Sequence, residues 1–211
     1  KRIIVMTKRE QARISRLTTE PAKIKVCYRG VDVNMFGTSS WKTGPCRRFL
    51  FVGRKSLEKG YDLLEQAASR IAKNYPEVTF TFAGTFNAST KGNCIYLGYV
   101  DYENLPDLYT EHDAVVVCSR SEGFPQVIME AMSNGLPCIM SRHLFDQDFE
   151  ENMNASFCDT TVDDICAKIK RLIEDRNFYA ELAKGAWEYA GKHFDENTNR
   201  RLYRQTLLEN D

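Results

Sequence analysis

The segment that decides the fold of this chain is residues 114–140, AVVVCSRSEGFPQVIMEAMSNGLPCIM. It opens with an apolar, β-branched run that is typical of a buried strand, and it closes with a second apolar run at 137–140. Pro125 and Gly135 stand where helices commonly begin and end, so we expect a helix over 125–134. A strand, a helix and a second strand in this order predict a parallel β-α-β unit.

The same alternation extends in both directions along the chain. Short apolar runs that we predict to be strands lie at 49–52, 78–82, 94–97, 114–117, 137–140 and, more weakly, 155–158. Helical patterns follow Gly60 and recur over 165–173 and 178–189. Strands that are nearly continuously apolar need cover on both faces. The predicted fold class is therefore α/β, a Rossmann-like parallel sheet with helices on both faces.

The two ends differ from this middle part. Residues 1–22 are predicted to form one strand and one helix, and the polar stretch 37–45 to be a linker. Residues 196–211 are predicted to form a charged helix with few apolar anchors, which usually needs a partner to pack on. We therefore predict a division into 1–22, 23–195 and 196–211. The abrupt opening on a strand-like run without an initiator Met favours a fragment of a longer protein.

Composition excludes several classes of protein. Of the 211 residues, 43% are hydrophobic and 27% charged, which suits a folded domain, and Lys+Arg and Asp+Glu are both 29, which argues against nucleic-acid binding. The seven cysteines are scattered, without Cys-x-x-Cys or zinc-ligand spacing, so we expect no metal and a reduced, intracellular setting. No run is long enough to cross a bilayer and no signal peptide is visible, which favours the cytoplasm.

In open parallel sheets, ligands bind beyond the carboxyl ends of the strands. The loop after 49–52 reads GRKSLEKG over residues 53–60 and carries Arg54 and Lys59. A guanidinium fork and a compact ammonium both suit phosphate oxygens. The loop lacks the spacing of a Walker phosphate loop. A solvated basic surface loop is the alternative interpretation.

The loop after 114–117 carries Glu122, and the predicted helix that follows carries Glu130. The free amides at the helix start, at Gln126 and Val127, can bind a phosphate. At about 1.5 Å of rise per residue the two carboxylates lie roughly 10 Å apart, which suits hydroxylated rings at the two ends of one ligand. The alternative is an acid that favours the helix dipole together with a surface Glu. Cations, helix start and acids together predict a nucleotide-sugar site.

The block Glu122-Gly123-Phe124-Pro125-x4-Glu130-Ala131-Met132-x2-Gly135-x-Pro137 resembles the Glu-x7-Glu signature of glycosyltransferase family 4, a retaining family with the GT-B fold. Weaker similar features follow the family's order and cover roughly residues 24–195. They are Gly30-Val31-Asp32 with Phe36, Val52-Gly53-Arg54, Lys59-Gly60, Gly84 and Tyr96-Leu97-Gly98-Tyr99-Val100.

The resemblance implies roles for individual residues. Arg54, Lys59 and Glu122 would be catalytic, with the two cations binding the donor diphosphate and stabilising the leaving group. Glu130 would hold the ribose, and Glu122 would orient the donor sugar. The donor-binding set would be Gly53, Arg54, Lys59, Gly84, Tyr99, Val100, Ser119, Glu122, Gly123, Phe124, Pro125, Gln126, Val127 and Glu130. The donor would be a UDP- or GDP-sugar, with no metal and no cofactor.

The resemblance also implies an acceptor, a glycan or a lipid-linked sugar, held by an N-terminal domain of which 1–22 would be the last strand and helix. Such a parent could associate peripherally with a membrane, and the fragment alone would bind donor but transfer poorly. Three sites depart from the family: Cys118 stands where Pro is commoner, Thr85-Phe86 replaces a usual glycine, and Arg142-His143 stands where small residues often follow the strand. His143 either contacts the donor or caps a loop. A nucleotide-sugar-binding module without catalysis is the main alternative; a GT-B epimerase or phosphorylase is another.

Overall fold

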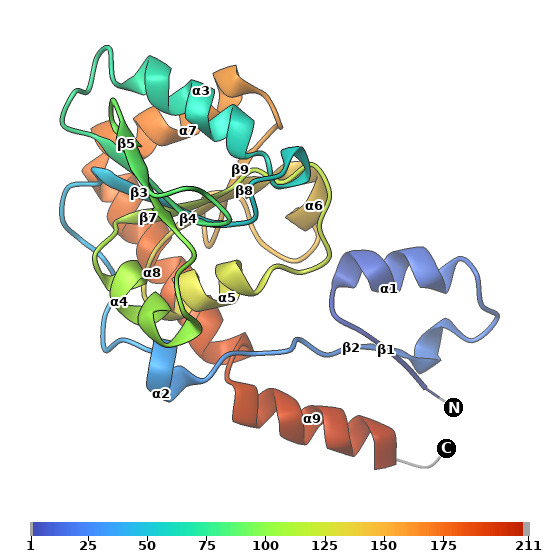
Figure 1. Ribbon diagram of the computed structural model, residues 1–211. Coiled ribbons are helices and arrows are strands. Elements are labelled where there is room, and N and C mark those ends of the chain that lie inside the picture. Colours follow the sequence, from blue (N-terminus) through green and yellow to red (C-terminus); the bar gives the residue numbers. More distant parts are fainter. Residues whose placement is uncertain (1, 209–211) are drawn as a thin grey trace.

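A seven-stranded sheet forms the centre of the protein (Figure 1). The computed structural model describes residues 2–208, so Lys1 and residues 209–211 of the predicted end segments lie outside the described part. The strands of the central sheet, given in chain order, are β3 (Arg48–Gly53), β4 (Thr79–Gly84), β5 (Ser89–Lys91), β6 (Cys94–Gly98), β7 (Ala114–Val117), β8 (Cys138–Ser141) and β9 (Ser156–Cys158).

The spatial order of the strands is β5-β6-β4-β3-β7-β8-β9, and every pairing is parallel except that of β5 with β6. From β3 the chain builds outward to β4 and β6, then returns to place β7 on the other side of β3. The order therefore reverses between β3 and β7. Ligands of doubly wound sheets bind at such a reversal, beyond the carboxyl ends of the strands.

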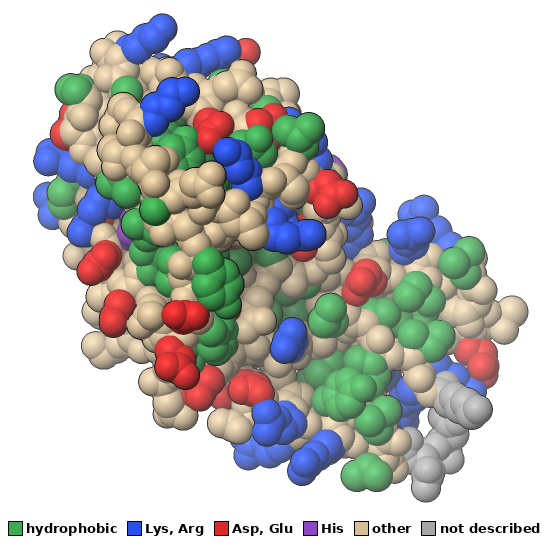
Figure 2. Space-filling view, in the orientation of Figure 1, with side chains coloured by type: hydrophobic (Ala, Val, Ile, Leu, Met, Phe, Trp, Pro, Cys, Tyr) green, Lys and Arg blue, Asp and Glu red, His purple; other side chains and the backbone are tan. Residues whose placement is uncertain are grey.

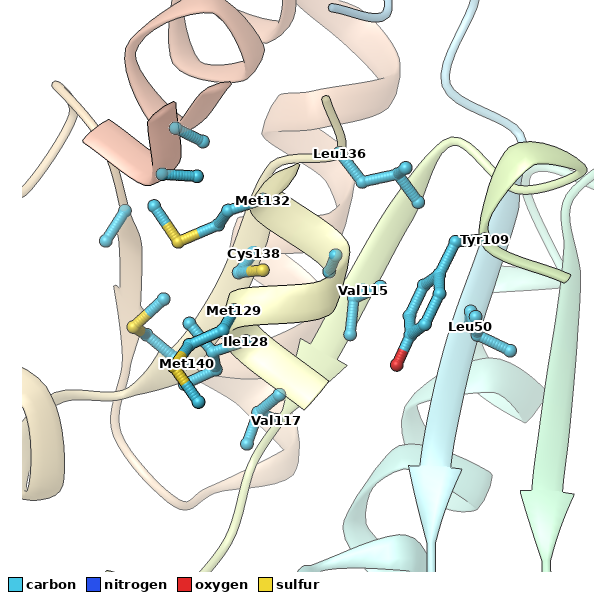
Figure 3. Packing of buried hydrophobic residues seen from close by; sticks show 14 of the residues in the cluster. Leu50, Tyr109, Val115, Val117, Ile128, Met129, Met132, Leu136, Cys138 and Met140 are labelled. Carbon is cyan, nitrogen blue, oxygen red and sulfur yellow. The ribbon is translucent and has the colours of Figure 1, made fainter. Parts of the chain in front are cut away.

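Helices cover both faces of the sheet, as the apolar strands require. On one face lie α3 (Tyr61–Ile71) and α7 (Val162–Glu174); on the other lie α4 (Leu105–Thr110) and α5 (Gln126–Ser133), while α8 (Arg176–His193) contributes to both cores. Side chains of β3 alternate between the cores, with Phe49 and Phe51 facing α3 and Leu50 facing α5. Figure 3 shows the core on the α5 side of the sheet, where α5 side chains meet those of β7 and β8.

A smaller lobe is built from both ends of the chain (Figure 1). It contains β1 (Ile3–Val5), α1 (Lys8–Ser15), the 3₁₀ helix η1 (Pro21–Lys23), β2 (Ile24–Val26) and α9 (Glu196–Leu208), with β1 and β2 paired in parallel. The Arg2 guanidinium donates to the Thr206 carbonyl at 3.0 Å, and the Cys27 thiol contacts the Asn199 carbonyl at 3.6 Å. The charged C-terminal helix therefore packs on the N-terminal residues and is not left without a partner.

The predicted elements of the sheet are confirmed within one or two residues. The helix predicted at 125–134 is α5, with Pro125 as its N-cap, Asn134 as its C-cap and Gly135 following the C-cap at φ 71°. The elements that the sequence did not reveal are all short. They are η1, β2, β5, α2 (Val33–Phe36), η2 (Leu57–Lys59), η3 (Tyr102–Asn104), α4 and α6 (Arg142–Phe145). The linker predicted at 37–45 has neither helix nor strand.

All seven cysteines fall within the described residues and are buried free thiols. Over residues 2–208, none of the helices combines the length and the apolar character needed to span a bilayer.

Candidate functional site

Lys59 and Glu122 meet at the point where the strand order reverses. Lys59 closes η2 in the loop between β3 and α3, and Glu122 lies in the loop between β7 and α5. The Lys59 Nζ atom and the Glu122 Oε2 atom form an ion pair, with side chains that are 23% and 15% exposed. The cation and the acid that the sequence placed after two different strands are thus in direct contact, and Lys59 does not belong to a solvated surface loop.

Arg120 holds these two loops together. Its backbone N–H donates to the Glu58 carbonyl at 2.7 Å, and its guanidinium donates to the Leu57 carbonyl and to both carboxylate oxygens of Asp62, at 2.7 and 2.8 Å. The hydrogen bonds from Arg120 lower the pKa of Asp62, which lies in the first turn of α3. Sequence reasoning missed this pair, because a lone Arg in a polar loop carries no mark of its partner.

Gly60 allows the close approach of η2 to the end of β7. It has φ 74°, and a Cβ at this position would lie 2.1 Å from the Cys118 carbonyl oxygen. The Cys118 thiol in turn contacts the Gly60 carbonyl at 3.2 Å. A larger residue would therefore push Lys59 away from Glu122.

The departure at Thr85-Phe86 shapes the loop of residues 53–60. The Lys55 N–H donates to the Thr85 hydroxyl at 2.8 Å, and the Lys55 ammonium lies 5.7 and 5.8 Å from the ring centroids of Tyr61 and Phe86. Lys55 is therefore engaged with an aromatic surface. Arg54 is exposed, and its side chain has no hydrogen bond or ion pair within residues 2–208, so its contact with a diphosphate stays a prediction.

Two of the predicted donor-binding glycines end neighbouring strands. Gly53 is the last residue of β3 and Gly84 the last of β4, and they are paired in register. A Cβ on Gly84 would lie 1.8 Å from the Gly53 carbonyl oxygen. Glycine keeps the two strand ends together under the loop that carries Arg54.

The start of α5 presents unpaired backbone amides next to Glu122. In the described part of the chain, the N–H groups of Gly123, Phe124, Gln126 and Val127 donate to no acceptor, and Pro125 has no N–H. Free amides and the positive end of a helix dipole form a ready anion site.

Two side chains anchor the loop that leads into α5. The Phe124 ring packs on a cluster formed by Tyr28, Phe145, Phe149 and Phe194. The buried Ser119 offers its carbonyl to the Ser141 hydroxyl at 2.7 Å. The loop is therefore fixed on both sides of Glu122.

Glu130 is buried, at 3% exposure, so the alternative of a surface Glu is wrong for this residue. Its Oε2 accepts a hydrogen bond from the Tyr109 hydroxyl at 2.7 Å. Burial raises the pKa of Glu130, and hydrogen bonds from Tyr109 and Gln126 oppose that rise. No ion pair involves Glu130 among residues 2–208, so this carboxylate retains acceptor capacity for hydroxyl donors. Sequence reasoning missed Tyr109, which lies on the short helix α4.

The segment after β6 borders the same end of the sheet. The Tyr99 side chain is 78% exposed, whereas Val100 is half-buried against the α5 core. Tyr102, in η3, accepts a hydrogen bond from the Gln126 side chain at 3.3 Å. His143, from α6, has its Nε2 atom 3.1 Å from the Arg120 carbonyl, which agrees with the loop-capping role rather than a free ligand.

A Rossmann-like sheet with a cation, two acids and an open helix start at its strand-order reversal has the arrangement of a nucleotide-binding domain. The family described as "Glycosyl transferases group 1" matches residues 42–189, and the chain belongs to this family.

Named relatives agree with this membership. Spore coat protein SA of Bacillus subtilis is 31% identical over 160 residues, which cover 60% of this chain and 42% of that protein. The Escherichia coli UDP-Gal:alpha-D-GlcNAc-diphosphoundecaprenol alpha-1,3-galactosyltransferase is 31% identical over 152 residues. These residues cover 61% of this chain and 39% of that protein. The crystal structure of Anabaena HepE in complex with UDP has a TM-score of 0.82 at 21% identity, covering 98% of this chain and 63% of that one. The chain thus spans less than two thirds of each of these proteins, and the solved structures that it resembles are GT-B glycosyltransferases.

Proposed function

We propose that this chain is the donor-binding part of a retaining glycosyltransferase of family 4 and binds a UDP- or GDP-sugar. The observation that carries the proposal is the contact of Lys59 with Glu122 beside the free amides of α5. A pyrophosphate at this point would meet an ammonium and backbone donors, with a carboxylate on the side of the sugar.

The proposed chemistry divides the site into three parts. Arg54 and Lys59, with the amides of Gln126 and Val127, bind the diphosphate and stabilise the negative charge that grows on it as the glycosidic bond breaks. Glu122, with the amides of Gly123 and Phe124, orients the donor sugar. Glu130 accepts hydrogen bonds from the ribose hydroxyls, supported by its burial and its single hydroxyl donor, Tyr109. The proposal includes neither a metal nor a cofactor.

Relatives support the class of substrate. HepE was solved with UDP, and the Escherichia coli relative is named for a UDP-Gal donor and a diphosphoundecaprenol-linked acceptor. For the whole protein we propose transfer to a glycan or lipid-linked sugar, held by an N-terminal domain to which 1–22 belong. We also propose a cytoplasmic location, either free or at the cytoplasmic face of a membrane, because all seven thiols are free.

Isothermal titration of the chain with UDP, GDP and a panel of their sugar conjugates tests donor binding. We expect one nucleotide to bind, and we expect the double variant Lys59→Ala, Glu130→Ala to lose that binding while Lys55→Ala keeps it. Unchanged affinity in the double variant would end the proposal. Transfer of radiolabelled sugar by the whole protein separates a transferase from a module that only binds.

A further inference from the structure

A cavity of about 300 Å³ lies beside Glu122, between the smaller lobe and the sheet domain. One wall is α1, which contributes Arg9 and Arg13; the other is the loop before α5 with α6, which contributes Gly123 and His143. Figure 2 shows Lys and Arg side chains on both lobes near this junction. Neither Lys59 nor Gln126 lines the cavity, so it lies on the sugar side of the proposed donor site and not on the diphosphate side.

The two walls are fixed relative to each other by a buried carboxylate. Asp148, only 2% exposed, accepts hydrogen bonds on Oδ1 from the Lys8 N–H at 2.8 Å and from the Tyr28 hydroxyl at 3.1 Å. Lys8 is the first residue of α1, so its amide would otherwise lack a helical partner. The bond therefore holds the start of α1 against the sheet domain, and with it the distance across the cavity.

Most charged groups around the cavity already have partners. The Glu10 carboxylate accepts from the Met6 N–H at 2.9 Å, and the Glu10 N–H donates to the hydroxyl of the N-cap residue Thr7 at 2.9 Å. Glu122 pairs with Lys59, and the Arg120 guanidinium is bound to Asp62. The exceptions are Arg9 and Arg13, whose side chains have no hydrogen bond or ion pair within residues 2–208. They are four residues apart on α1 and so project from the same side of the helix. Of the acids in the wall, Glu122 is thus paired with a cation and Glu10 is hydrogen-bonded to backbone, while two guanidinium forks are free.

We infer that Arg9 and Arg13 form an acceptor subsite that binds a phosphate group carried by the acceptor. The inference rests on the proposed function, because it places the donor sugar at Glu122. An acceptor that enters this cavity lies between that sugar and the two arginines. Guanidinium forks match phosphate oxygens in a bidentate manner, whereas a neutral sugar gives two unpaired cations no counter-charge. The structure therefore favours a sugar phosphate or a diphosphate-linked sugar over a neutral glycan.

Titration of the chain with glucose 1-phosphate, geranyl diphosphate and methyl glucoside, each at saturating UDP, tests the subsite. UDP occupies the diphosphate site, so a phosphate that still binds must bind elsewhere. We expect at least one of the two phosphates to bind and the neutral glucoside not to. In the variant Arg9→Gln, Arg13→Gln the phosphate affinity should fall about tenfold or more, and UDP affinity should not change. Binding of glucose 1-phosphate indicates a soluble sugar phosphate, and binding of geranyl diphosphate alone indicates a lipid-linked one.

Arg16→Gln, at the C-cap of α1 and outside the cavity lining, is the matched control and should leave phosphate binding intact. All three arginines are exposed, so the variants should keep the thermal stability of the parent chain. Equal phosphate affinity in the double variant and the control overturns the inference, as does equal binding of methyl glucoside or displacement of the phosphate by UDP. If UDP itself does not bind, the proposed function fails first and the subsite with it.

Discussion

Lys59 and Glu122 are 63 residues apart in sequence, yet the Lys59 ammonium is bound to the Glu122 carboxylate across the reversal in strand order. An ammonium has three N–H donors, so one bond to Glu122 leaves two for other acceptors. Glu122 therefore does not block Lys59 as a phosphate ligand. It fixes the position of the Nζ atom and keeps the charge on the side of the crevice where α5 begins.

Lys59→Ala should weaken UDP binding by a factor of about 10 to 100, because one or two charge-assisted hydrogen bonds to the diphosphate are lost. Titration calorimetry measures the change. Lys55→Ala removes a cation from the same loop whose ammonium lies over Tyr61 and Phe86, and we expect little effect on affinity. Equal losses in the two variants would mean that the loop contributes only general positive charge.

Tyr109→Phe should destabilise the protein by about 1.5–3 kcal/mol, because the buried Glu130 carboxylate loses its hydroxyl donor. Urea unfolding measures the free energy. Tyr102→Phe is the control, since the Tyr102 hydroxyl accepts from Gln126 and its side chain is 46% exposed, so its removal should cost little. A Tyr109→Phe variant as stable as Tyr102→Phe would contradict the assigned hydrogen bond.

Glu130 should make the stability of the protein fall as the pH rises. Burial raises the pKa of Glu130 above the ordinary value of 4.5. At pH values between 4.5 and the raised pKa, the folded state therefore binds more protons than the unfolded state. The cost of the buried charge is therefore absent below pH 4.5 and fully present above the raised pKa. Glu130→Gln should gain stability relative to the parent chain as the pH increases through this window.

Thermal unfolding of both proteins at a series of pH values checks this prediction. Glu111→Gln, an exposed acid at the end of α4, is the control and should show a constant difference from the parent. A difference for Glu130→Gln that stays constant with pH, or that changes in the opposite direction, would show that the folded protein does not hold the proton more tightly.

The sheet could be predicted from the sequence because each central strand carries a buried run that is mostly apolar. Phe49, Leu50 and Phe51 face alternate cores, and both cores are covered, so no polar position interrupts the run. Short elements could not be predicted. The edge strand β5 is exposed at all three positions, and α2 and α6 have four residues each, too few for a helical period to show.

The candidate site was predictable to the extent that it follows strand ends. Lys59, Glu122 and the start of α5 were placed correctly because a parallel sheet brings its carboxyl ends to one edge. Ion pairs between different elements could not be predicted. Arg120 and Asp62 are 58 residues apart, and the choice of partner depends on the packing of η2. Nothing in the sequence alone marks which acid an arginine will bind.

Two glycines of α8 should respond to alanine in opposite ways. Both are helical, so alanine removes the same backbone entropy cost at each, a gain of about 0.5–1 kcal/mol. At Gly191 the new Cβ meets nothing within 4 Å, so Gly191→Ala should raise stability by that amount.

At Gly185 the Cβ would lie 1.9 Å from the Met153 carbonyl oxygen, and the loop around Met153 would have to move. Overpacking of this kind costs about 1–3 kcal/mol, which exceeds the gain, so Gly185→Ala should lower the free energy of unfolding in urea. Because the two changes share helix, residue type and intrinsic propensity, their difference measures how closely α8 approaches that loop, and a stabilised Gly185→Ala variant would show that the approach is looser.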